Sequence, residues 1–306
     1  MLATKSFSCF CIMNNSTHLD ISVIGHVTKD LNNSHLSVGG AAYYTGMTTL
    51  RLGAKTGLLT RCNPEVSSKI NRNFTYYMNL GSNVTTSFEN TYINGKRSQV
   101  LRSLANYIQL TDIPKEIVDS SVVVLAPVAQ DIDPKLVLSF PNSMLAISPQ
   151  GWLRTWDRSG HVARLAWNNN IAINQAKFLF VSVDDLINGL IPRSWLKSDR
   201  IVILTEGTKG ALLFVQGVWY RIPAFSAREK DPTGAGDVFV GAYLVRYLEL
   251  EDPIEAALFA SCAASFKAEA IGEMGIPTRE EIEARLGDQP KQVVIRTNGP
   301  KLNYTL

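Results

Sequence analysis

Residues 231–237 read Asp-Pro-Thr-Gly-Ala-Gly-Asp, and this stretch, the Gly-Ala-Gly loop, is the most informative in the chain. Gly234 and Gly236 let the backbone turn tightly and direct its amide hydrogens into one concavity. The apolar run 238–245 predicts a helix directly after the loop, so the loop lies at a helix N-terminus, where unpaired N–H groups attract anions. The sequence therefore predicts an anion site with the carboxylate of Asp237 beside it.

Two interpretations of this loop are open from its residues alone. An anion hole next to a carboxylate suits phosphoryl transfer, because the amides hold developing charge while the acid accepts a hydroxyl proton. A plain Gly-rich turn capped by Asp237 would have the same sequence, since aspartate is a favoured N-cap residue. The remainder of the chain favours the first interpretation.

The composition is globular and excludes several classes of protein. The 306 residues are 45% hydrophobic and 19% charged, which suits one large α/β domain. The net charge of +3 comes from dispersed Lys and Arg, so we expect no nucleic-acid partner. No apolar run is long enough to cross a bilayer, and the four cysteines show no metal-binding spacing. We expect a cytoplasmic protein with reduced thiols and no membrane partner.

Short β-branched runs alternate with helical patterns, which is typical of a parallel sheet covered by helices on both faces. The predicted buried strands are 21–25, 122–125, 145–147, 178–181 and 201–204. The predicted helices are 39–52, a segment from Pro253 to Ala270, and a last helix that begins at the capping box 278–281. A strand pair turned at Gln216-Gly217 completes the α/β pattern.

One strand pair interrupts this alternation. Residues 86–93 and 96–102 are joined by Asn94-Gly95, the strongest short hairpin signal. We expect a lid hairpin at about 84–103 that projects from the sheet as a flap, although an edge hairpin fits the pattern equally well. The predicted organisation is an N-terminal lead at 1–18, a core at 19–287 and a C-terminal tail at 288–306.

The common phosphate-binding motifs are absent: the chain has no G-x-x-x-x-G-K-[ST], no G-x-G-x-x-G after a strand and no protein-kinase catalytic loop. The pattern instead resembles the ribokinase, or PfkB, family of carbohydrate kinases. The Gly-Ala-Gly loop looks like that family's D-x-x-G-A-G-D signature. The family's first strand, sugar-binding Asp, di-glycine turn and nucleotide loop look like Val23-Ile24-Gly25, Asp30, Gly39-Gly40 and Thr205–Gly210.

This resemblance implies a ribokinase-like fold, with a mainly parallel sheet and a small β lid, and an ATP-dependent carbohydrate kinase. It implies phosphoryl transfer to a hydroxyl of a small polyol, a sugar or a cyclitol, with ATP and Mg²⁺. Asp237 would be the catalytic base and would contact the acceptor. Gly234, Ala235 and Gly236 would form the anion hole. The ATP site would comprise Thr205, Gly207, Gly210 and Thr233, and the rest of the acceptor site would comprise Asp30, Gly39 and Gly40. The flap would close over the acceptor and keep water from the donor.

Departures from the family pattern concern the acceptor more than the reaction. Ala-Ala-Tyr-Tyr at 41–44 replaces the segment with the usual acceptor-binding Asn, so a tyrosine ring would reshape the pocket. The Asn-x-x-Glu motif appears as Ser-Val-Asp-Asp at 182–185, where Asp185 keeps the acid with a shorter reach and an indirect role toward the metal. Arg154 either reaches a phosphate or decorates the surface. The plant-type inositol kinases of this family are similarly divergent.

Several alternatives stay open. Only eight residues separate Asp30 from Gly39, so the first part of the usual lid looks trimmed. His26 follows the first strand near the expected acceptor pocket, where we favour a packed histidine over a ligand contact. A nucleoside or vitamin kinase of the same fold, or a non-catalytic ligand-binding protein on that fold, would fit the same pattern. The acceptor and its phosphorylated hydroxyl, the dependence on monovalent ions, the oligomeric state (a homodimer through the flap included) and the origin of residues 1–12 are not fixed by the sequence.

Overall fold

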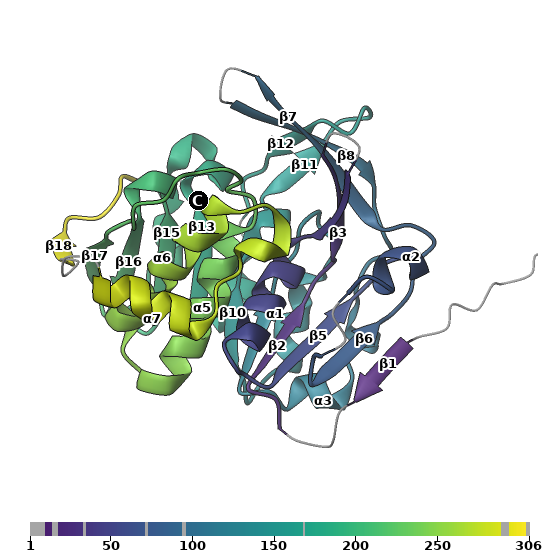
Figure 1. The fold of residues 1–306 in the computed structure, drawn as a ribbon, viewed down its shortest axis with the longest axis horizontal. Helices are drawn as coiled ribbons and strands as arrows, with labels where there is room; N and C mark the ends of the chain where they lie inside the picture. Colours follow the sequence, from purple (N-terminus) through teal and green to yellow (C-terminus); the bar gives the residue numbers. More distant parts are fainter. Residues whose placement is uncertain are drawn as a thin grey trace, which may run out of the picture.

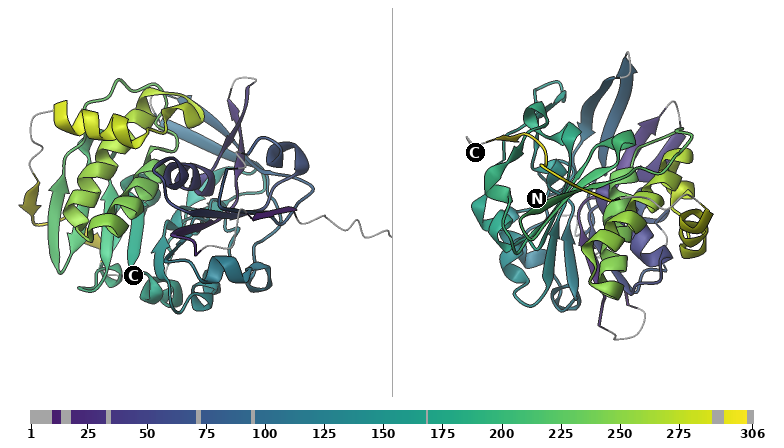
Figure 2. Two further views of the ribbon diagram at one scale, coloured as in Figure 1. Left: turned by 60° about the horizontal axis from the view of Figure 1, so that its bottom comes forward. Right: turned by 90° about the vertical axis from the view of Figure 1, so that its left-hand side faces the viewer.

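The structure is a computed structural model that describes residues 10–13, 18–32, 35–70, 73–93, 96–167, 169–288 and 294–303. A large sheet runs through the middle of the molecule, and helices cover both of its faces (Figure 1; Figure 2). The strands from β6 (Tyr76–Asn79) to β15 (Ile201–Thr205) in spatial order run parallel, and the remaining neighbours at the two edges are antiparallel. The predicted α/β architecture with a mainly parallel sheet is confirmed.

The strands of this sheet follow a crossed order, which is typical of helix-connected parallel sheets. In spatial order they are β1 (Phe10–Met13), β6 (Tyr76–Asn79), β5 (Thr56–Thr60), β2 (Ile21–Ile24), β9 (Val122–Leu125), β10 (Met144–Ile147), β13 (Phe178–Ser182), β15 (Ile201–Thr205), β16 (Ala211–Val215), β17 (Val218–Ile222) and β18 (Ile295–Thr297). The predicted buried strands all lie in this sheet. The turn between β16 and β17 has positive φ at both Gln216 (50°) and Gly217 (79°), as a tight hairpin requires.

The helices differ in which face of the sheet they cover. They are α1 (Ala41–Arg51), α2 (Pro64–Ser67), α3 (Lys115–Val118), α4 (Asn170–Gln175), α5 (Ala235–Leu250), α6 (Pro253–Glu269) and α7 (Arg279–Asp288). Apolar residues of α1, α5, α6 and α7 join one hydrophobic cluster, whereas those of α3 and α4 join a second cluster on the opposite face. Figure 2 shows the sheet between these two layers.

The sequence of the central strands explains why both faces are covered. Val122 and Val124 of β9 join the cluster beneath α1, α5 and α6, while Val123 and Leu125 join the opposite one. Because successive side chains of a strand point to opposite faces, a strand buried on both sides needs a continuous apolar run. All four residues are fully buried.

The starts of α6 and α7 agree with the predicted signals. Asp252 caps α6 by accepting hydrogen bonds from the amides of Ile254 (2.9 Å) and Glu255 (3.0 Å). Thr278 and Glu281 form the predicted capping box of α7: the Thr278 amide donates to the Glu281 carboxylate at 2.7 Å, and the Glu281 amide donates to Thr278 Oγ1 at 3.4 Å. These caps fix where the two helices begin.

The lid is larger than the sequence indicates. The predicted hairpin is present as β7 (Thr86–Ile93) and β8 (Lys96–Ser103), and its Asn94-Gly95 turn lies outside the described residues. β3 (Thr28–Asn32) and β4 (His35–Gly39) join it in a separate sheet of order β4-β3-β7-β8. The segment expected to be trimmed is therefore a short hairpin of the lid. Figure 1 shows β3, β7 and β8 rising from one end of the central sheet.

Smaller elements complete the described chain. They are β11 (Arg154–Trp156), paired with β12 (Val162–Arg164), and β14 (Ile191–Pro192), paired with β19 (Leu302–Asn303). β1 lies within the predicted N-terminal lead and pairs with β6, and β18 of the predicted tail extends the other edge of the sheet. Among the described residues, no helix combines the length and apolarity that a membrane span requires.

Candidate active site

The Gly-Ala-Gly loop leads directly into α5, as the sequence predicts. Gly234 is the N-cap residue of α5 and has φ 86°, a left-handed conformation that favours glycine. A Cβ atom at Gly234 would lie only 2.7 Å from the Tyr44 ring. A Cβ at Gly236 would meet nothing within 4 Å, so the first turn of α5 faces open space. The loop thus has one tightly packed side and one open side, and the open side carries the helix N-terminus.

Hydrogen bonds within the loop fix its path. The Thr233 amide donates to Asp231 Oδ1 at 3.0 Å, and the Ala235 amide donates to Pro232 O at 3.0 Å. The amides in the first turn of a helix have no intrahelical acceptor, and they carry the positive end of the helix dipole. Of the predicted anion-hole amides, that of Ala235 already has a backbone acceptor, whereas that of Gly236 lies on the open side.

Close packing of α1 on α5 positions Asp237. A Cβ atom at Gly241 of α5 would lie 2.8 Å from Thr45 O and 2.8 Å from Thr48 Cβ, so the two helix backbones approach each other directly. Thr45 Oγ1 donates a hydrogen bond to the backbone oxygen of Asp237 at 3.2 Å. The half-buried Asp237 therefore stands in the first turn of α5, at the point where the two helices meet.

The predicted acceptor residues lie together, where the lid joins α1. Gly40 is the N-cap residue of α1 with φ 96°, and a Cβ atom there would lie 2.8 Å from His26 O, just beyond β2. Gly39 ends β4 opposite Thr28, and Asp30 lies in β3 of the lid. The structure thus brings Asp30, Gly39 and Gly40 to one region of the molecule. Their contact with an acceptor stays a prediction.

The predicted nucleotide loop follows β15. Thr205 ends that strand, and the turn after it is closed by a hydrogen bond from the Glu206 amide to Gly210 O at 2.8 Å. Gly207 and Gly210 have φ 58° and 86°, and a Cβ atom at Gly210 would lie 2.1 Å from Ile222 O. The loop therefore presses on the segment that leads from β17 toward the Gly-Ala-Gly loop. It lies at the carboxyl end of a parallel strand, where ligands of open α/β sheets bind.

The candidate metal-linked residue has a defined partner. Asp185 lies in the short turn after β13 and is half-buried. The Gln150 side-chain amide donates to its two carboxylate oxygens, at 3.2 Å and 3.4 Å. Ser182 accepts from the Asp184 amide at 3.2 Å and so closes the turn. Within the described ranges, no cluster of three or more His, Cys, Asp or Glu side chains could hold a metal ion by itself.

The expectation for the tyrosines needs correction, and Arg154 has a contact that the sequence did not indicate. The tyrosines after the di-glycine turn do not line an open pocket: the ring of Tyr44 packs beneath Gly234, and the Tyr43 hydroxyl donates to the Glu273 carboxylate. Both side chains are buried, and burial together with Glu273 raises the pKa of Tyr43 well above its ordinary value. Arg154 places its guanidinium 5.4 Å from the centre of the Phe88 ring and so supports the lid.

His26 is a packed residue, as favoured from the sequence. Its ring nitrogens lie 2.8 Å from Thr86 Oγ1 and 2.9 Å from Asn106 O, and its amide donates to Asp131 Oδ2 at 3.1 Å. Burial lowers the pKa of His26 below its ordinary value, although the neighbouring Asp131 opposes this shift. His26 therefore joins the end of β2 to the base of the lid.

The sequence analysis missed Lys267 of α6, which lies beneath the Gly-Ala-Gly loop. Its ammonium group donates to Asp231 O at 3.1 Å, and the side chain is fully buried. The available signal was a lysine inside the otherwise uncharged, Ala-rich stretch 256–268. Lysine is rarely fully buried without a partner, so such a residue indicates a specific contact.

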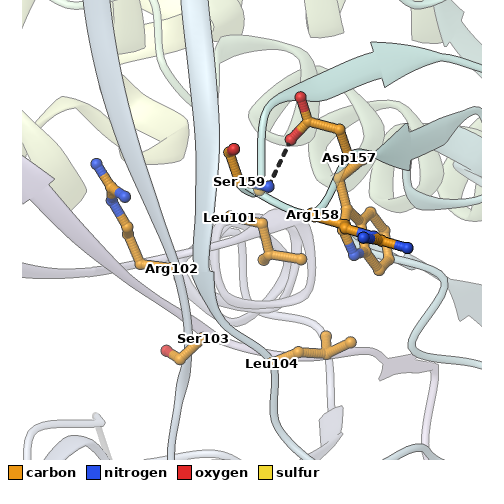
Figure 3. A pocket seen from close by; sticks show the side chains of 9 residues that line it. Leu101, Arg102, Ser103, Leu104, Asp157, Arg158 and Ser159 are labelled. Carbon is orange, nitrogen blue, oxygen red and sulfur yellow. Dashed lines mark hydrogen bonds between the residues drawn. The ribbon is translucent and has the colours of Figure 1, made fainter.

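A hollow of about 500 Å³ lies apart from these residues, between β8 of the lid and the β11–β12 hairpin (Figure 3). Its lining residues are Leu101, Arg102, Ser103, Leu104, Trp156, Asp157, Arg158, Ser159 and Gly160. The Ser159 amide donates to Asp157 Oδ1 at 2.8 Å, as Figure 3 shows. None of the predicted catalytic or ligand-binding residues lines this hollow.

Comparison with known proteins agrees with the geometry of the loop and the sheet. Residues 169–279, which include the Gly-Ala-Gly loop, match the family described as pfkB family carbohydrate kinase. A pyrophosphate-dependent kinase of the ribokinase family, solved with sulfate, superposes with a TM-score of 0.74 at 24% identity over 86% of this chain and 99% of that one. The chain has the ribokinase fold, and part of it is similar to the PfkB family.

Other ribokinase-fold structures superpose nearly as well. A pyrophosphate-dependent kinase in complex with a pyrophosphate analogue and myo-inositol gives a TM-score of 0.71 at 23% identity, over 86% of this chain and 99% of that one. Ribokinase of Arabidopsis thaliana, solved with ribose and ATP, gives 0.68 at 15% identity, over 89% and 100%. The predicted ribokinase-like fold is confirmed.

Sequence relatives match shorter segments. A 2-dehydro-3-deoxygalactonokinase of Haloferax volcanii is 37% identical over 83 residues, which are 27% of this chain and 26% of that protein. A nucleoside kinase of Methanocaldococcus jannaschii is 27% identical over 150 residues (48% and 49%), and an inositol 3-kinase of Arabidopsis thaliana is 36% identical over 72 residues (24% and 20%). The chain spans no more than about half the length of these relatives.

Proposed function

We propose that this protein transfers a phosphoryl group from ATP, bound with Mg²⁺, to a hydroxyl of a small polyol, either a sugar or a cyclitol. Asp237 is the catalytic base in this proposal, and the loop of Gly234, Ala235 and Gly236 is the anion hole. The ATP site comprises Thr205, Gly207, Gly210 and Thr233, and Asp30, Gly39, Gly40 and Asp237 contact the acceptor. The lid closes over it and excludes water.

One observation carries the proposal: a glycine-rich helix N-terminus opens to space beside a carboxylate. The left-handed Gly234 packs on Tyr44, while Gly236 has nothing within 4 Å of its would-be Cβ atom. Asp237 stands in the same helical turn and is held by Thr45 through its backbone oxygen. Preorganised amides of this kind stabilise charge that develops on a transferred phosphate.

The proposed reaction is an in-line displacement. Asp237 accepts the proton of the acceptor hydroxyl, whose oxygen forms a bond to the γ-phosphorus while the bond to the β,γ-bridging oxygen breaks and ADP leaves. The Gly236 amide is the best-placed donor to the transferred group, because the Ala235 amide already donates to Pro232 O. Positioning and electrostatics supply most of the catalysis in phosphoryl transfer, so no covalent intermediate is needed.

The donor set of the chain fits a magnesium ion that is held mainly by the donor phosphates. Mg²⁺ prefers oxygen ligands, keeps several waters and commonly uses only one or two carboxylates. Asp185 offers one half-buried carboxylate, oriented by Gln150 at 3.2 and 3.4 Å, and would act through an intervening water. When bound, the ion would neutralise part of the phosphate charge.

The relatives favour particular acceptors and one rival donor. An inositol 3-kinase and a complex with myo-inositol are among the proteins to which the chain is similar, which favours a cyclitol acceptor. Pyrophosphate-dependent kinases are among the similar structures, so inorganic pyrophosphate is the second candidate donor. The nucleoside kinase relative supports a nucleoside acceptor as the alternative within enzymes. A vitamin kinase of this fold, or a binding protein without turnover, would retain the loop geometry.

The test is turnover by the purified protein with Mg²⁺ and either ATP or pyrophosphate, across sugars, inositols, nucleosides and vitamins that carry a free hydroxyl. We expect one polyol to be phosphorylated with ATP, and Asp237→Asn to lower kcat by at least about 1,000-fold, the scale of a lost general base plus its charge. Asp288→Asn, an exposed change at the end of α7, is the matched control and should leave kcat unchanged.

Thermal unfolding of each variant separates loss of chemistry from loss of fold. Turnover by Asp237→Asn at the rate of the unchanged protein would refute the assigned base. Turnover only with pyrophosphate would replace the donor. Tight binding of a polyol without turnover with either donor would favour the non-catalytic alternative.

A further inference from the structure

A buried ammonium group lies directly beneath the Gly-Ala-Gly loop. Lys267 is in the last turn of α6, and its side chain has no exposed surface. Its Nζ atom donates to Asp231 O at 3.1 Å and to Ala270 O at 3.0 Å, and it lies 3.6 Å from Asp231 Oδ2. Burial of an unpaired charge is strongly unfavourable, so these three oxygens must compensate for lost water.

These oxygens connect the loop to the C-terminal end of α6. Asp231 is the first residue of the loop, and Ala270 is the C-cap residue of α6. The amides of Lys230 and Asp231 also donate to Ala268 O, at 2.7 Å and 3.1 Å. The negative end of the helix dipole lies here, which favours a cation. Lys267 therefore holds the stem of the loop against the end of α6.

The contacts continue from the ammonium group to the anion hole. Asp231 Oδ2 faces Lys267, and the other oxygen of the same carboxylate accepts the Thr233 amide at 3.0 Å. Thr233 precedes Gly234, whose backbone packs on the Tyr44 ring. The Lys267 ammonium lies 5.6 Å from the centre of that ring, within the range of a cation–π contact. The Lys267 ammonium group thus contacts Asp231 at the stem of the loop and the Tyr44 ring beneath its turn.

The surroundings leave little freedom for the Lys267 side chain. A Cβ atom at Gly275 would lie 2.9 Å from Lys267 Cα and 3.0 Å from its Cδ, so the Gly275 backbone encloses the alkyl stem. Burial lowers the pKa of Lys267, while the carboxylates of Asp231 and Asp237 favour its charged form. The same cation therefore stabilises the loop and contributes to the field at the proposed base.

Two backbone carbonyls, a carboxylate and an aromatic face are also the groups that coordinate a monovalent cation. We propose that Lys267 is a positioning residue whose ammonium group serves as a built-in cation beneath the Gly-Ala-Gly loop, so that the reaction needs no free monovalent ion. This inference rests on the proposed kinase function. In this inference a covalently attached amine takes the role that K⁺ or NH₄⁺ would otherwise have.

The experiment compares kcat in tetramethylammonium buffer with kcat after addition of K⁺, Na⁺ or NH₄⁺. We expect the unchanged protein to respond to none of these ions. Lys267→Met fills the space without a charge, and we expect kcat to fall on the order of 100-fold, without rescue by any ion, because a misplaced loop costs about that factor. Lys267→Ala keeps the oxygen ligands and leaves a space for an ion, so K⁺ or NH₄⁺ should raise the kcat of this variant at least about ten-fold.

Controls separate this inference from the proposed function. Lys230→Met removes an exposed lysine from the same loop stem and should leave kcat and its ion response unchanged. Inorganic phosphate binding, followed by thermal shift, reports on the loop without turnover. It should weaken in Lys267→Met and recover with K⁺ in Lys267→Ala, even if no acceptor is turned over.

Three results would overturn the inference. They are several-fold activation of the unchanged protein by K⁺, a kcat for Lys267→Met equal to that of the unchanged protein, and equal loss in both Lys267 variants without ion rescue. The last result, with lowered thermal stability, would assign Lys267 a purely structural role. Turnover by Asp237→Asn at the rate of the unchanged protein would instead refute the proposed base, whatever the Lys267 variants show.

Discussion

The loop side and the lid side of this molecule are held in place by different means. The Gly-Ala-Gly loop is fixed by a left-handed Gly234 on the Tyr44 ring, by Asp231, and by a fully buried lysine. The lid is held by edge pairing between β7 and β8, by Arg154 over Phe88, and by His26 at its base. On the loop side, backbone conformation and buried charge act together, whereas the lid is held by strand pairing within its own sheet and by a few side-chain contacts at its base and edge.

This difference suggests a division of labour. Groups that stabilise a transition state must be preorganised to within a fraction of an ångström, and the close packing of α1 on α5 provides that rigidity. A lid must open and close, so it is drawn from the less strongly stabilised part of a fold. Changes on the loop side should therefore affect turnover, and changes on the lid side should affect the KM of the acceptor.

Among the substitutions that compare the loop side with the lid side, Gly234→Ala should have the largest effect. The substitution meets both a positive φ of 86° and a Tyr44 ring 2.7 Å from the new Cβ atom. We expect the free energy of unfolding to fall by about 2–4 kcal/mol and kcat to fall by at least about 100-fold. Chemical denaturation and steady-state kinetics measure the two quantities.

Gly236→Ala is the matched control, two residues along the same loop. A Cβ atom there meets nothing within 4 Å, so stability should change by no more than about 1 kcal/mol. Equal destabilisation by the two substitutions would contradict the claim that the loop has a packed side and an open side. Adding Tyr44→Ala to Gly234→Ala would separate the steric contact from the backbone strain.

An intermediate effect is expected from Arg154→Met on the lid side. The change removes a guanidinium 5.4 Å from the centre of the Phe88 ring and its hydrogen bond to Val128 O at 3.0 Å. We expect the KM of the acceptor to rise about 3- to 10-fold, the range of a partly buried cation–π contact, with kcat and the KM of the donor nearly constant. Initial rates with either substrate varied distinguish these parameters.

Arg158→Met tests whether the hollow beside the lid, rather than the lid itself, sets the acceptor KM. Arg158 is exposed and lines that hollow (Figure 3). We expect no change in either KM for this variant. A rise in the acceptor KM confined to Arg158→Met would move the acceptor site into the hollow.

The smallest effect should be a dependence of stability on pH from His26. Burial lowers the pKa of His26 in the folded protein below the ordinary value of about 6.5, so the unfolded chain binds the proton more readily. This stability is fully present above pH 6.5 and is lost as the pH falls from there toward the folded pKa. Asp131 opposes the shift and Arg61 adds to it.

Thermal unfolding between about pH 7.5 and pH 5 tests this expectation. The unchanged protein should lose melting temperature as the pH falls, and His26→Gln should show a flatter profile. A profile of the same slope in both proteins would show that another group carries the dependence.

Much of the fold and of the candidate site could be predicted from the sequence, because the signals for these features are local. The limits of β7, the capping box at Thr278 and the turn at Gln216 each follow from a few adjacent residues. The path of the loop into α5 follows likewise from Gly234 and from the apolar run 238–245 after the loop. Local chemistry dictates local structure in these places, and the structure agrees with it.

The parts that could not be predicted depend on residues far apart in the chain. The segment 28–39 is short and mostly polar. No pattern within it indicates that β3 pairs with β7, more than fifty positions later. Lys267 lies 36 positions from its partner Asp231, and a lysine in a helix is by default an exposed residue. The packing of Tyr44 against Gly234 likewise joins residues far apart in the chain, and no local pattern indicates it.

The direct contact between α1 and α5 has a consequence for how such proteins diversify. Because Gly241 brings the two helix backbones together, the proposed base and the proposed anion hole lie in one closely packed block of α1 and α5. Of the described lid strands, β4 leads through Gly40 directly into α1. We therefore expect that exchange of residues 28–39 and 86–103 between related chains transfers acceptor preference and leaves the proposed catalytic residues of α5 in place.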